Sequence, residues 1–354
     1  MIEEGHGNLL TADVDALVNT VNTVGVMGKG IALQFKRAYP ANYKAYRAAC
    51  ARDEVRLGRM FVVDSGALGL RRYVINFPTK GHWRSAARIE DIEAGLEDLV
   101  RVVRELGVGS IAIPALGCGN GGLAWAEVRP LIERACARIP DVRAVVFAPA
   151  GAPAPASMPN ATRRPRLTAL RAQLLAAVGR YLERARLQEV RDGISELEIQ
   201  KIAYFLQTLG APLRLEFVRG RYGPYSDRLG HVLDTLEGHY LTGFGDRSAR
   251  VTELAPINPT AGAVEEAQAE LDLHPDDAER VSALLALVDG FETPYSLELL
   301  ATVHFAASQP PVSGDPKVLA DRVAAWSLRK ARLFTVEHVH LAARRLAEHE
   351  LLPA

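Results

Sequence analysis

The sequence has no excess of charge of either sign, no membrane-length apolar run and few cysteines. Its 42 basic and 42 acidic side chains balance, so contact with nucleic acid or a membrane would need a local patch. No apolar run approaches the roughly 20 residues of a membrane span. The N-terminus also lacks the basic, apolar and small-residue order of a signal peptide. These absences predict a cytoplasmic protein with no membrane contact.

The three cysteines, Cys50, Cys118 and Cys136, lie far apart and form no CxxC pair. This spacing argues against a disulfide framework and against a structural zinc site. No metal-binding cluster is visible in the sequence, so we expect neither a metal nor an organic cofactor.

The first part of the chain alternates short β-branched runs with helical patterns, and the whole chain is long enough for two domains. "DALVNT", "RMFVVD", "RRYVINF", "SIAIPAL" and "VRAVVFAPA" read as strands. Between them, apolar residues at steps of three and four predict a helix with one buried face: Ile89, Ile92, Leu96, Leu99, Val103 and Leu106. The alternation predicts a mainly parallel sheet in a three-layer α/β/α domain over residues 1–150.

Periodicity stops in a stretch rich in proline, alanine and small polar residues, which predicts a linker over residues 151–166. Residues 167–354 carry mostly helical patterns, with a short extended piece at "RLEFVRG". We therefore expect a mainly helical C-terminal domain.

Two glycine-rich loops each follow a predicted strand and precede a predicted helix. The first is "VNTVNTVGVMGKGIALQF" (18–35) and the second "PALGCGNGGLAW" (114–125). Such loops present backbone N–H groups to phosphate, and two of them can hold a diphosphate. The first loop matches neither the P-loop nor the GxGxxG dinucleotide pattern, because its glycine spacing and flanking residues differ.

With "GNLL" added, these loops resemble a macrodomain, a fold that binds ADP-ribose. The likeness covers about the first 150 residues and is strongest to DarG-type antitoxins and to related glycohydrolases. It implies that Asn8 and Leu9 contact adenine, and that Asn22 contacts the distal ribose while Asn19 braces the loop. It further implies diphosphate contacts from both loops, namely from Gly28, Lys29, Gly30, Ile31, Gly117, Cys118, Gly119, Asn120 and Gly121.

In "INFPTKGHWR" a strand ends at Lys80, where the resembled glycohydrolases carry a catalytic lysine. A neutral amine can attack the anomeric carbon, whereas a charged one can hydrogen-bond the leaving group or order a water. The sequence leaves these roles open. Protein-directed relatives carry an aspartate where this chain has Gly121, so water, the substrate base or another side chain would complete the reaction. His82 lies close in sequence and is a candidate for proton transfer.

The C-terminal part resembles the Panacea-like helical domain of toxin-neutralising proteins and the end of DarG-type proteins. The resemblance implies an antitoxin whose macrodomain removes ADP-ribose from bases of single-stranded DNA. Its C-terminal domain would bind the cognate DarT-type toxin, with Tyr222, Pro224 and Tyr225 as candidate contacts.

Other functions stay open at this point. The chain can instead be a protein ADP-ribose glycohydrolase, a reaction that Gly121 disfavours, or a non-catalytic ADP-ribose-binding module. Arg163, Arg164 and Arg166 make DNA binding by the linker region a third possibility. Neither the modified base, thymine or guanine, nor the oligomeric state follows from the sequence.

Overall fold

The computed structural model describes residues 1–249 and 255–352 of the chain, which folds as two compact units. Unit 1 contains Met1–Arg163 and the segment that begins at Gly245, of which residues 245–249 are described. Unit 2 contains Arg164–Phe244 and the chain after that segment. The sequence did not predict that a segment so far from the N-terminus belongs to unit 1.

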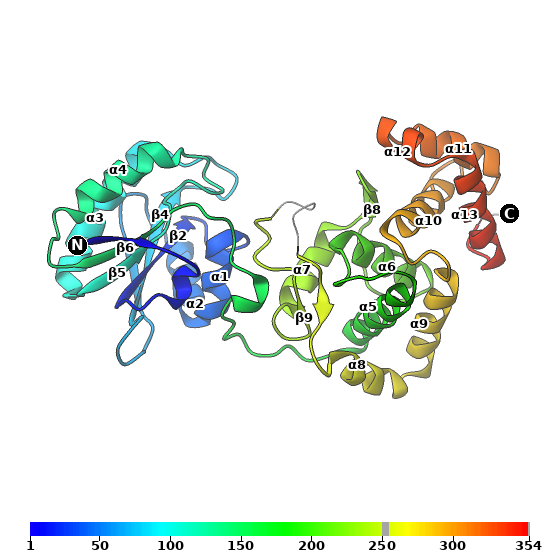
Figure 1. Cartoon of the computed structure of the whole chain (residues 1–354), viewed down its shortest axis with the longest axis horizontal. Helices are drawn as coiled ribbons and strands as arrows, with labels where there is room; N and C mark the ends of the chain where they lie inside the picture. The colour runs from blue at the N-terminus through cyan, green and yellow to red at the C-terminus, as the bar shows by residue number, and fades with distance from the viewer. Residues whose placement is uncertain (250–254, 353–354) are drawn as a thin grey trace. The chain divides into compact units, whose positions relative to one another are not determined.

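Unit 1 is built on one six-stranded sheet (Figure 1). The strand order is β1 (Ile2–Gly5), β6 (Arg143–Phe147), β5 (Ser110–Ile113), β2 (Ala16–Asn22), β4 (Tyr73–Lys80) and β3 (Phe61–Asp64). All neighbours are parallel except β3 and β4, which are antiparallel. The edge strand β1 was not predicted, because "IEEG" carries no apolar alternation.

Helices cover both faces of this sheet, as Figure 1 shows. The helices α1 (Gly30–Ala38) and α2 (Pro40–Ala51) pack on one face, and α3 (Ile89–Leu106) and α4 (Trp125–Cys136) pack on the other. The predicted three-layer α/β/α architecture is confirmed. The periodic apolar face predicted for residues 89–106 is α3, and the helix ends at Gly107, whose left-handed φ of 62° suits a glycine.

The predicted linker contributes structure to unit 1. It contains a short 3-10 helix, η2 (Pro155–Ser157), and the backbone N–H of Ala161 donates to the carbonyl of Arg37 in α1. The domain boundaries at residues 150 and 167 stay predictions.

Unit 2 is mainly helical, as predicted, and the bounds of its elements are as follows. The helices are α5 (Ala169–Gln188), α6 (Glu196–Thr208), α7 (Asp227–Leu236), α8 (Ala263–Asp272), α9 (Pro275–Leu287), α10 (Pro294–Ala307), α11 (Pro316–Ala324), α12 (Leu328–Leu333) and α13 (Val336–Glu348). Two short antiparallel pairs accompany them, β7 (Val218–Gly220) with β8 (Gly223–Tyr225), and β9 (Leu241–Thr242) with β10 (Asn258–Pro259).

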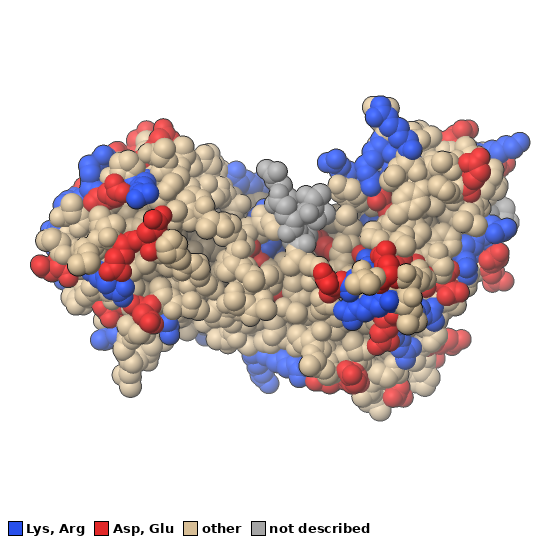
Figure 2. Space-filling view, viewed as in Figure 1, with Lys and Arg blue, Asp and Glu red and all other residues tan. Residues whose placement is uncertain are grey.

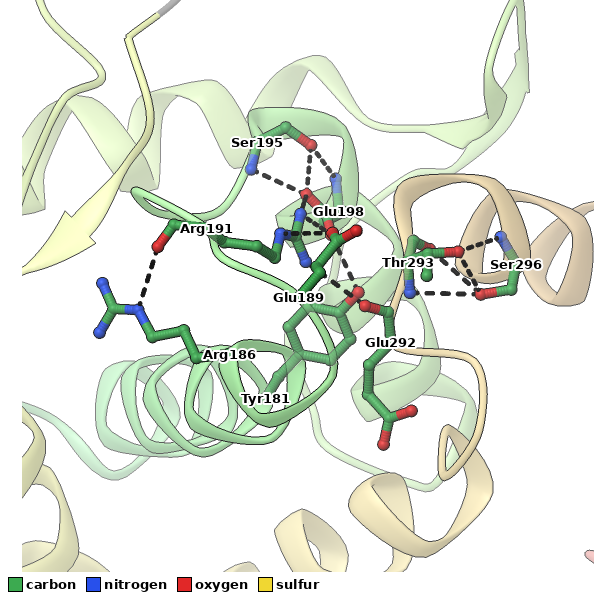
Figure 3. A network of polar contacts seen from close by, with 9 residues as sticks. All are labelled: Tyr181, Arg186, Glu189, Arg191, Ser195, Glu198, Glu292, Thr293 and Ser296. Carbon is green, nitrogen blue, oxygen red and sulfur yellow. Dashed lines mark hydrogen bonds and ion pairs between the residues drawn. The ribbon is translucent and has the colours of Figure 1, made fainter.

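A polar network around Glu198 fastens the start of α6 inside unit 2 (Figure 3). Glu198 is 1% exposed, and its carboxylate accepts from the Tyr181 hydroxyl at 2.9 Å and from the Arg191 guanidinium at 2.7 and 2.9 Å. The backbone N–H and hydroxyl of Ser195 also donate to it, which forms a capping box. A buried charge with this many partners is a structural feature, because its desolvation is compensated.

Candidate active site

The predicted site residues gather where parallel strands end, the edge at which open α/β sheets bind ligands. Asn22 ends β2 and Lys80 ends β4, and the two residues are register partners across a local shift in pairing. The loop after β5 completes this edge, because the Lys80 ammonium donates to the carbonyl of Asn120 at 2.7 Å. The structure therefore brings the strand-end lysine and the second glycine loop together.

Asn22 shapes the first loop with its own side chain. Its Oδ1 accepts from the backbone N–H groups of Val24 at 3.1 Å and Val26 at 3.2 Å, and its Nδ2 donates to the Val26 carbonyl at 2.6 Å. Tyr46 of α2 holds Asn22 from behind, because its buried hydroxyl donates to the Asn22 carbonyl at 2.5 Å. The structure thus assigns Asn22 a loop-forming role, and its contact with the distal ribose stays a prediction.

The first loop leads into α1 with backbone conformations that require glycine. Gly25 and Gly30 have φ of 79° and 62°, where a side chain would be strained. Lys29 is exposed and precedes α1 without capping it, whereas Ile31 packs against the core. The N–H of Gly30 donates to the carbonyl of Asp246 at 2.8 Å, so this donor of the helix N-terminus already has a partner within unit 1.

The second loop is tightly folded around Gly117 and Gly121. Gly117 has a φ of 73°, and a Cβ on Gly121 would lie 2.4 Å from the Gly117 carbonyl oxygen and 2.9 Å from the Cβ of Ala87. This position cannot take the aspartate of protein-directed relatives without moving the backbone. The departure at Gly121 is therefore part of the loop geometry.

The two glycine loops approach each other. A Cβ built on Gly30 would lie 3.2 Å from Nδ2 of Asn120, so the start of α1 faces the second loop. Asn120 is exposed, and its side chain stands beside the Gly30 backbone while its carbonyl accepts from Lys80. This arrangement is the one expected of two loops that share a diphosphate.

Lys80 is only 9% exposed, so most of its side chain is shielded from water. Burial lowers the pKa of the ammonium, and no carboxylate among the described residues lies within ion-pair distance of it. A buried amine at a strand end, next to a proposed ligand loop, is the arrangement expected of a nucleophile.

Asn8 and Leu9 lie shortly after the end of β1, where the short 3-10 helix η1 (Leu9–Thr11) begins. Asn8 caps this helix, because its Oδ1 accepts from the Leu10 N–H at 3.0 Å. Its Nδ2 donates to the carbonyl of Ser157 at 3.0 Å, and Leu9 is buried in the core beneath it. The adenine contacts of both residues stay predictions.

Two other side chains considered for the chemistry are placed less favourably. His82 is exposed, and its Nδ1 accepts from the backbone N–H of Arg84. Cys118 is half-buried, burial raises the pKa of its thiol, and its Sγ contacts the Leu116 carbonyl. A thiol with a raised pKa is a poor nucleophile near neutral pH.

Sequence reasoning missed several supporting residues. Asn76 of β4 accepts from the side chains of Asn19 at 3.0 Å and Asn42 at 3.2 Å, and this buried amide ladder joins β2, β4 and α2. Asn19 therefore braces the sheet next to the first loop. Asn76 lies within the "INFPTKG" stretch that drew attention to Lys80, but Tyr46 and Asp246 carried no sequence signal.

No group of three or more His, Cys, Asp or Glu side chains in residues 1–249 and 255–352 is placed to hold a metal ion. Among the same residues, no helix is both long and apolar enough to cross a membrane.

Comparison with known protein sequences identifies the family of this chain. The model of the Macro domain matches residues 18–132. The chain is 45% identical to the "DNA ADP-ribosyl glycohydrolase" of Mycobacterium tuberculosis, with 98% of this chain and 99% of that protein covered. The Thermus aquaticus protein of the same name is 47% identical, with 99% and 94% covered. A Thermosipho africanus "DNA ADP-ribosyl transferase-DNA ADP-ribosyl glycohydrolase fusion protein" is 36% identical over 36% of this chain and 37% of its own.

Two solved structures are also similar to part of this chain. The macrodomain of Mycobacterium tuberculosis DarG is 57% identical and covers 42% of this chain and 99% of its own, with a TM-score of 0.42. The Thermosipho africanus DarTG in complex with ADP-ribose is 33% identical, covers 41% and 40%, and has a TM-score of 0.39.

Proposed function

Because the chain belongs to the DarG family of DNA ADP-ribosyl glycohydrolases, we propose that it removes ADP-ribose from a base of single-stranded DNA and acts as an antitoxin. It is a hydrolase of the ADP-ribosyl glycohydrolase class. The proposed substrate is cellular DNA, so the proposed location is the cytoplasm. Near-complete coverage of both chains supports extending the relatives' reaction to this protein.

The observation that carries the proposal is Lys80, a buried amine at the carboxyl edge of the sheet, held by the second glycine loop. In the proposed reaction, the neutral amine attacks the anomeric carbon of the distal ribose. The bond to the DNA base breaks, and the base leaves with its electron pair and takes up a proton. The sugar opens to an imine on Lys80, and water then hydrolyses this imine to release ADP-ribose and restore the amine.

The lowered pKa of Lys80 suits the first step, because the neutral fraction of the amine grows as the pKa falls. The same amine, protonated, can instead donate a hydrogen bond to the leaving base or to an attacking water. The two roles need opposite protonation states, so a pH profile separates them.

The ligand would lie across both glycine loops. We propose that the loop residues hold the diphosphate, that Asn22 and the loop it shapes hold the distal ribose, and that the region of Asn8 and Leu9 holds adenine. The Asn8 side chain already donates to Ser157, so adenine recognition would depend on the backbone near Leu9. Water, the base or another side chain would complete the second step, since Gly121 has no carboxylate and no room for one.

Toxin neutralisation is the second part of the proposal. A relative that joins a DNA ADP-ribosyl transferase to a glycohydrolase in one chain supports a functional pairing of these two activities. We assign binding of the cognate transferase to unit 2. Of the three candidate contacts in "RYGPYSD", Pro224 is buried, the Tyr225 hydroxyl donates to Glu196, and the Tyr222 ring lies against the guanidinium groups of Arg221 and Arg329. A toxin contact at these three residues stays a prediction.

The deciding experiment measures release of free ADP-ribose from a single-stranded oligonucleotide with one ADP-ribosylated base. Wild type, Lys80→Ala and the matched control Lys44→Ala, an exposed lysine of α2, are compared. We expect release by wild type and Lys44→Ala, and loss of release in Lys80→Ala with ADP-ribose affinity largely kept. Release by Lys80→Ala at the wild-type rate would remove this lysine from the mechanism. Binding of ADP-ribose without release by any variant would identify a binding module.

A further inference from the structure

Unit 2 carries a cluster of cationic and aromatic side chains outside the proposed active site. The basic patch, as we define it, consists of Arg219, Arg221, Tyr222, Trp326, Arg329 and Arg332. Its residues come from the β7–β8 hairpin, from the turn after α11 and from α12. Figure 2 shows Lys and Arg gathered over α12 and the tip of the hairpin, with little acidic surface between them. In a chain of zero net charge, such a local concentration of cations is informative.

The patch is held together by contacts between its two segments. The indole N–H of Trp326 donates to the carbonyl of Gly220 in β7 at 3.0 Å. In return, the Arg219 guanidinium donates to the carbonyls of Ala325 at 3.0 Å and Trp326 at 2.5 Å. The hairpin and the α11–α12 turn therefore form one surface, and its cations are positioned before any ligand arrives.

The guanidinium groups lie over aromatic rings. Arg219 stands 4.9 Å from the centre of the Trp326 ring, and Arg329 stands 4.8 Å from that of Tyr222. The guanidinium group of Arg221 also lies over the Tyr222 ring, 5.5 Å from the ring centre. Arginine held flat on an aromatic ring keeps its edge free for phosphate and loses little side-chain entropy on binding.

The positive charge of the patch is only partly neutralised. The Glu298 carboxylate accepts from Arg329 at 2.6 and 3.2 Å, and it also pairs with the buried ammonium of Lys330 at 2.7 Å. For the exposed Arg221 and Arg332, no carboxylate of the described residues lies within ion-pair distance. One acidic group thus serves two cations, and the outer arginines keep their full charge for a ligand.

We propose that the basic patch of unit 2 binds the sugar-phosphate backbone of single-stranded DNA, as a contact additional to those of the hydrolytic site. Guanidinium groups that rest on aromatic rings can track a single strand, since each guanidinium pairs with a phosphate through its N–H edge while the ring fixes its position. A protein partner would need a desolvated apolar centre, whereas the centre here is formed by guanidinium groups. The substrate class rests on the proposed function, but the binding itself does not require hydrolysis.

The test measures binding of an unmodified, fluorescently labelled single-stranded oligonucleotide to the full chain, by anisotropy at several salt concentrations. The test variant is Arg221→Glu with Arg332→Glu. The matched control is Lys44→Glu with Arg56→Glu, two exposed cations of unit 1 outside the basic patch, which changes the net charge equally. Circular dichroism and thermal unfolding of both variants check that the fold is kept.

We expect the patch variant to bind at least tenfold more weakly, with the slope of log affinity against log salt reduced by about two, while the control stays within about twofold. Equal losses in both variants would reduce the effect to net charge and overturn the proposal. Unchanged DNA affinity in the patch variant would also overturn it. If that variant lost affinity for the cognate transferase instead, the patch would be a protein-binding surface.

Hydrolysis separates this proposal from the proposed function. With an ADP-ribosylated mononucleotide, the patch variant should release ADP-ribose at the wild-type rate, because this substrate is too short to reach beyond the active site. With a long oligonucleotide, its KM should rise while kcat stays the same. Absence of release from every substrate by wild type would refute the hydrolase, yet the DNA-binding result would stand.

Discussion

Unit 1 buries Lys80, and unit 2 buries Lys201 and Lys330. Lys80 and Lys330 have different kinds of hydrogen-bond partner. Lys80 in unit 1 has the carbonyl of Asn120 as its hydrogen-bond partner. Lys330 in unit 2 is fully buried, and its ammonium donates to the Glu298 carboxylate at 2.7 Å and to the Thr302 hydroxyl at 3.0 Å. Burial lowers the pKa of both, and at Lys330 the charge of Glu298 partly offsets this.

The difference between a carbonyl partner and a carboxylate partner shows how a structural cluster compensates a buried charge. Burial alone would raise the pKa of the Glu298 carboxyl, but hydrogen bonds and charges from Arg329 and Lys330 lower it. That cluster is satisfied and stabilises the fold. Lys80 has no carboxylate partner among the described residues, and neither does the buried Lys201 of unit 2, whose ammonium donates to the Pro224 carbonyl at 2.9 Å. The catalytic role of Lys80 therefore stays a prediction that rests on the loops around it and not on burial alone.

The largest expected effect tests the structural lysine. Lys330→Ala should lower the free energy of unfolding of the full chain by about 3 kcal/mol, because it leaves buried polar groups unpaired. It should leave kcat for ADP-ribose release unchanged. Chemical denaturation and a release assay on the same preparation measure both. If the folded Lys330→Ala variant had a lower kcat than wild type, Lys330 would contribute to the reaction as well as to stability.

A smaller effect is expected at the second glycine loop. Gly121→Ala should lower the free energy of unfolding by about 2 kcal/mol and weaken ADP-ribose binding, because the new Cβ would clash with the Gly117 carbonyl oxygen. Gly109→Ala is the control, because it lies outside both glycine loops and a Cβ built there meets only Oδ2 of Asp15, at an ordinary contact distance of 3.5 Å. Calorimetric titration with ADP-ribose measures binding, and equal affinities in both variants would contradict the tight-loop explanation.

The pH dependence of release sharpens the role of Lys80. Below the pKa of an amine, its neutral fraction rises about tenfold per pH unit. Burial lowers the pKa of Lys80 below the ~10.4 of an ordinary lysine. If Lys80 is the nucleophile, kcat should rise with pH and level off below that value. A kcat that falls over the same range would instead identify the ammonium form as the hydrogen-bond donor.

The smallest expected effect has the opposite sign to that at Lys330. Lys80→Met should raise the free energy of unfolding by about 1 kcal/mol, because it replaces a buried amine that no carboxylate compensates with an apolar side chain of similar length. Chemical denaturation beside wild type measures the gain. A clear loss of stability would mean that Lys80 is a structural lysine after all.

Local patterns were enough to predict much of this protein. Strand and helix periods reveal the three-layer domain, because each element must bury one face, and α3 and the sheet agree with that reading. Glycine spacing identified both loops, because glycine has no Cβ and adopts backbone conformations that other residues avoid. Lys80 needed the family resemblance, because a lysine at a strand end is most often a solvated residue.

Other features depend on residues far apart in the chain, and only the tertiary structure decided them. Tyr46 contacts Asn22 from another element, residues 245–249 join unit 1, and the basic patch unites the β7–β8 hairpin with the turn before α12. Whether Lys80 or Lys330 keeps a paired charge is likewise a matter of which side chains the fold brings within hydrogen-bond distance. A pKa depends on burial and neighbours in space, and neither can be read from a residue and its sequence neighbours alone.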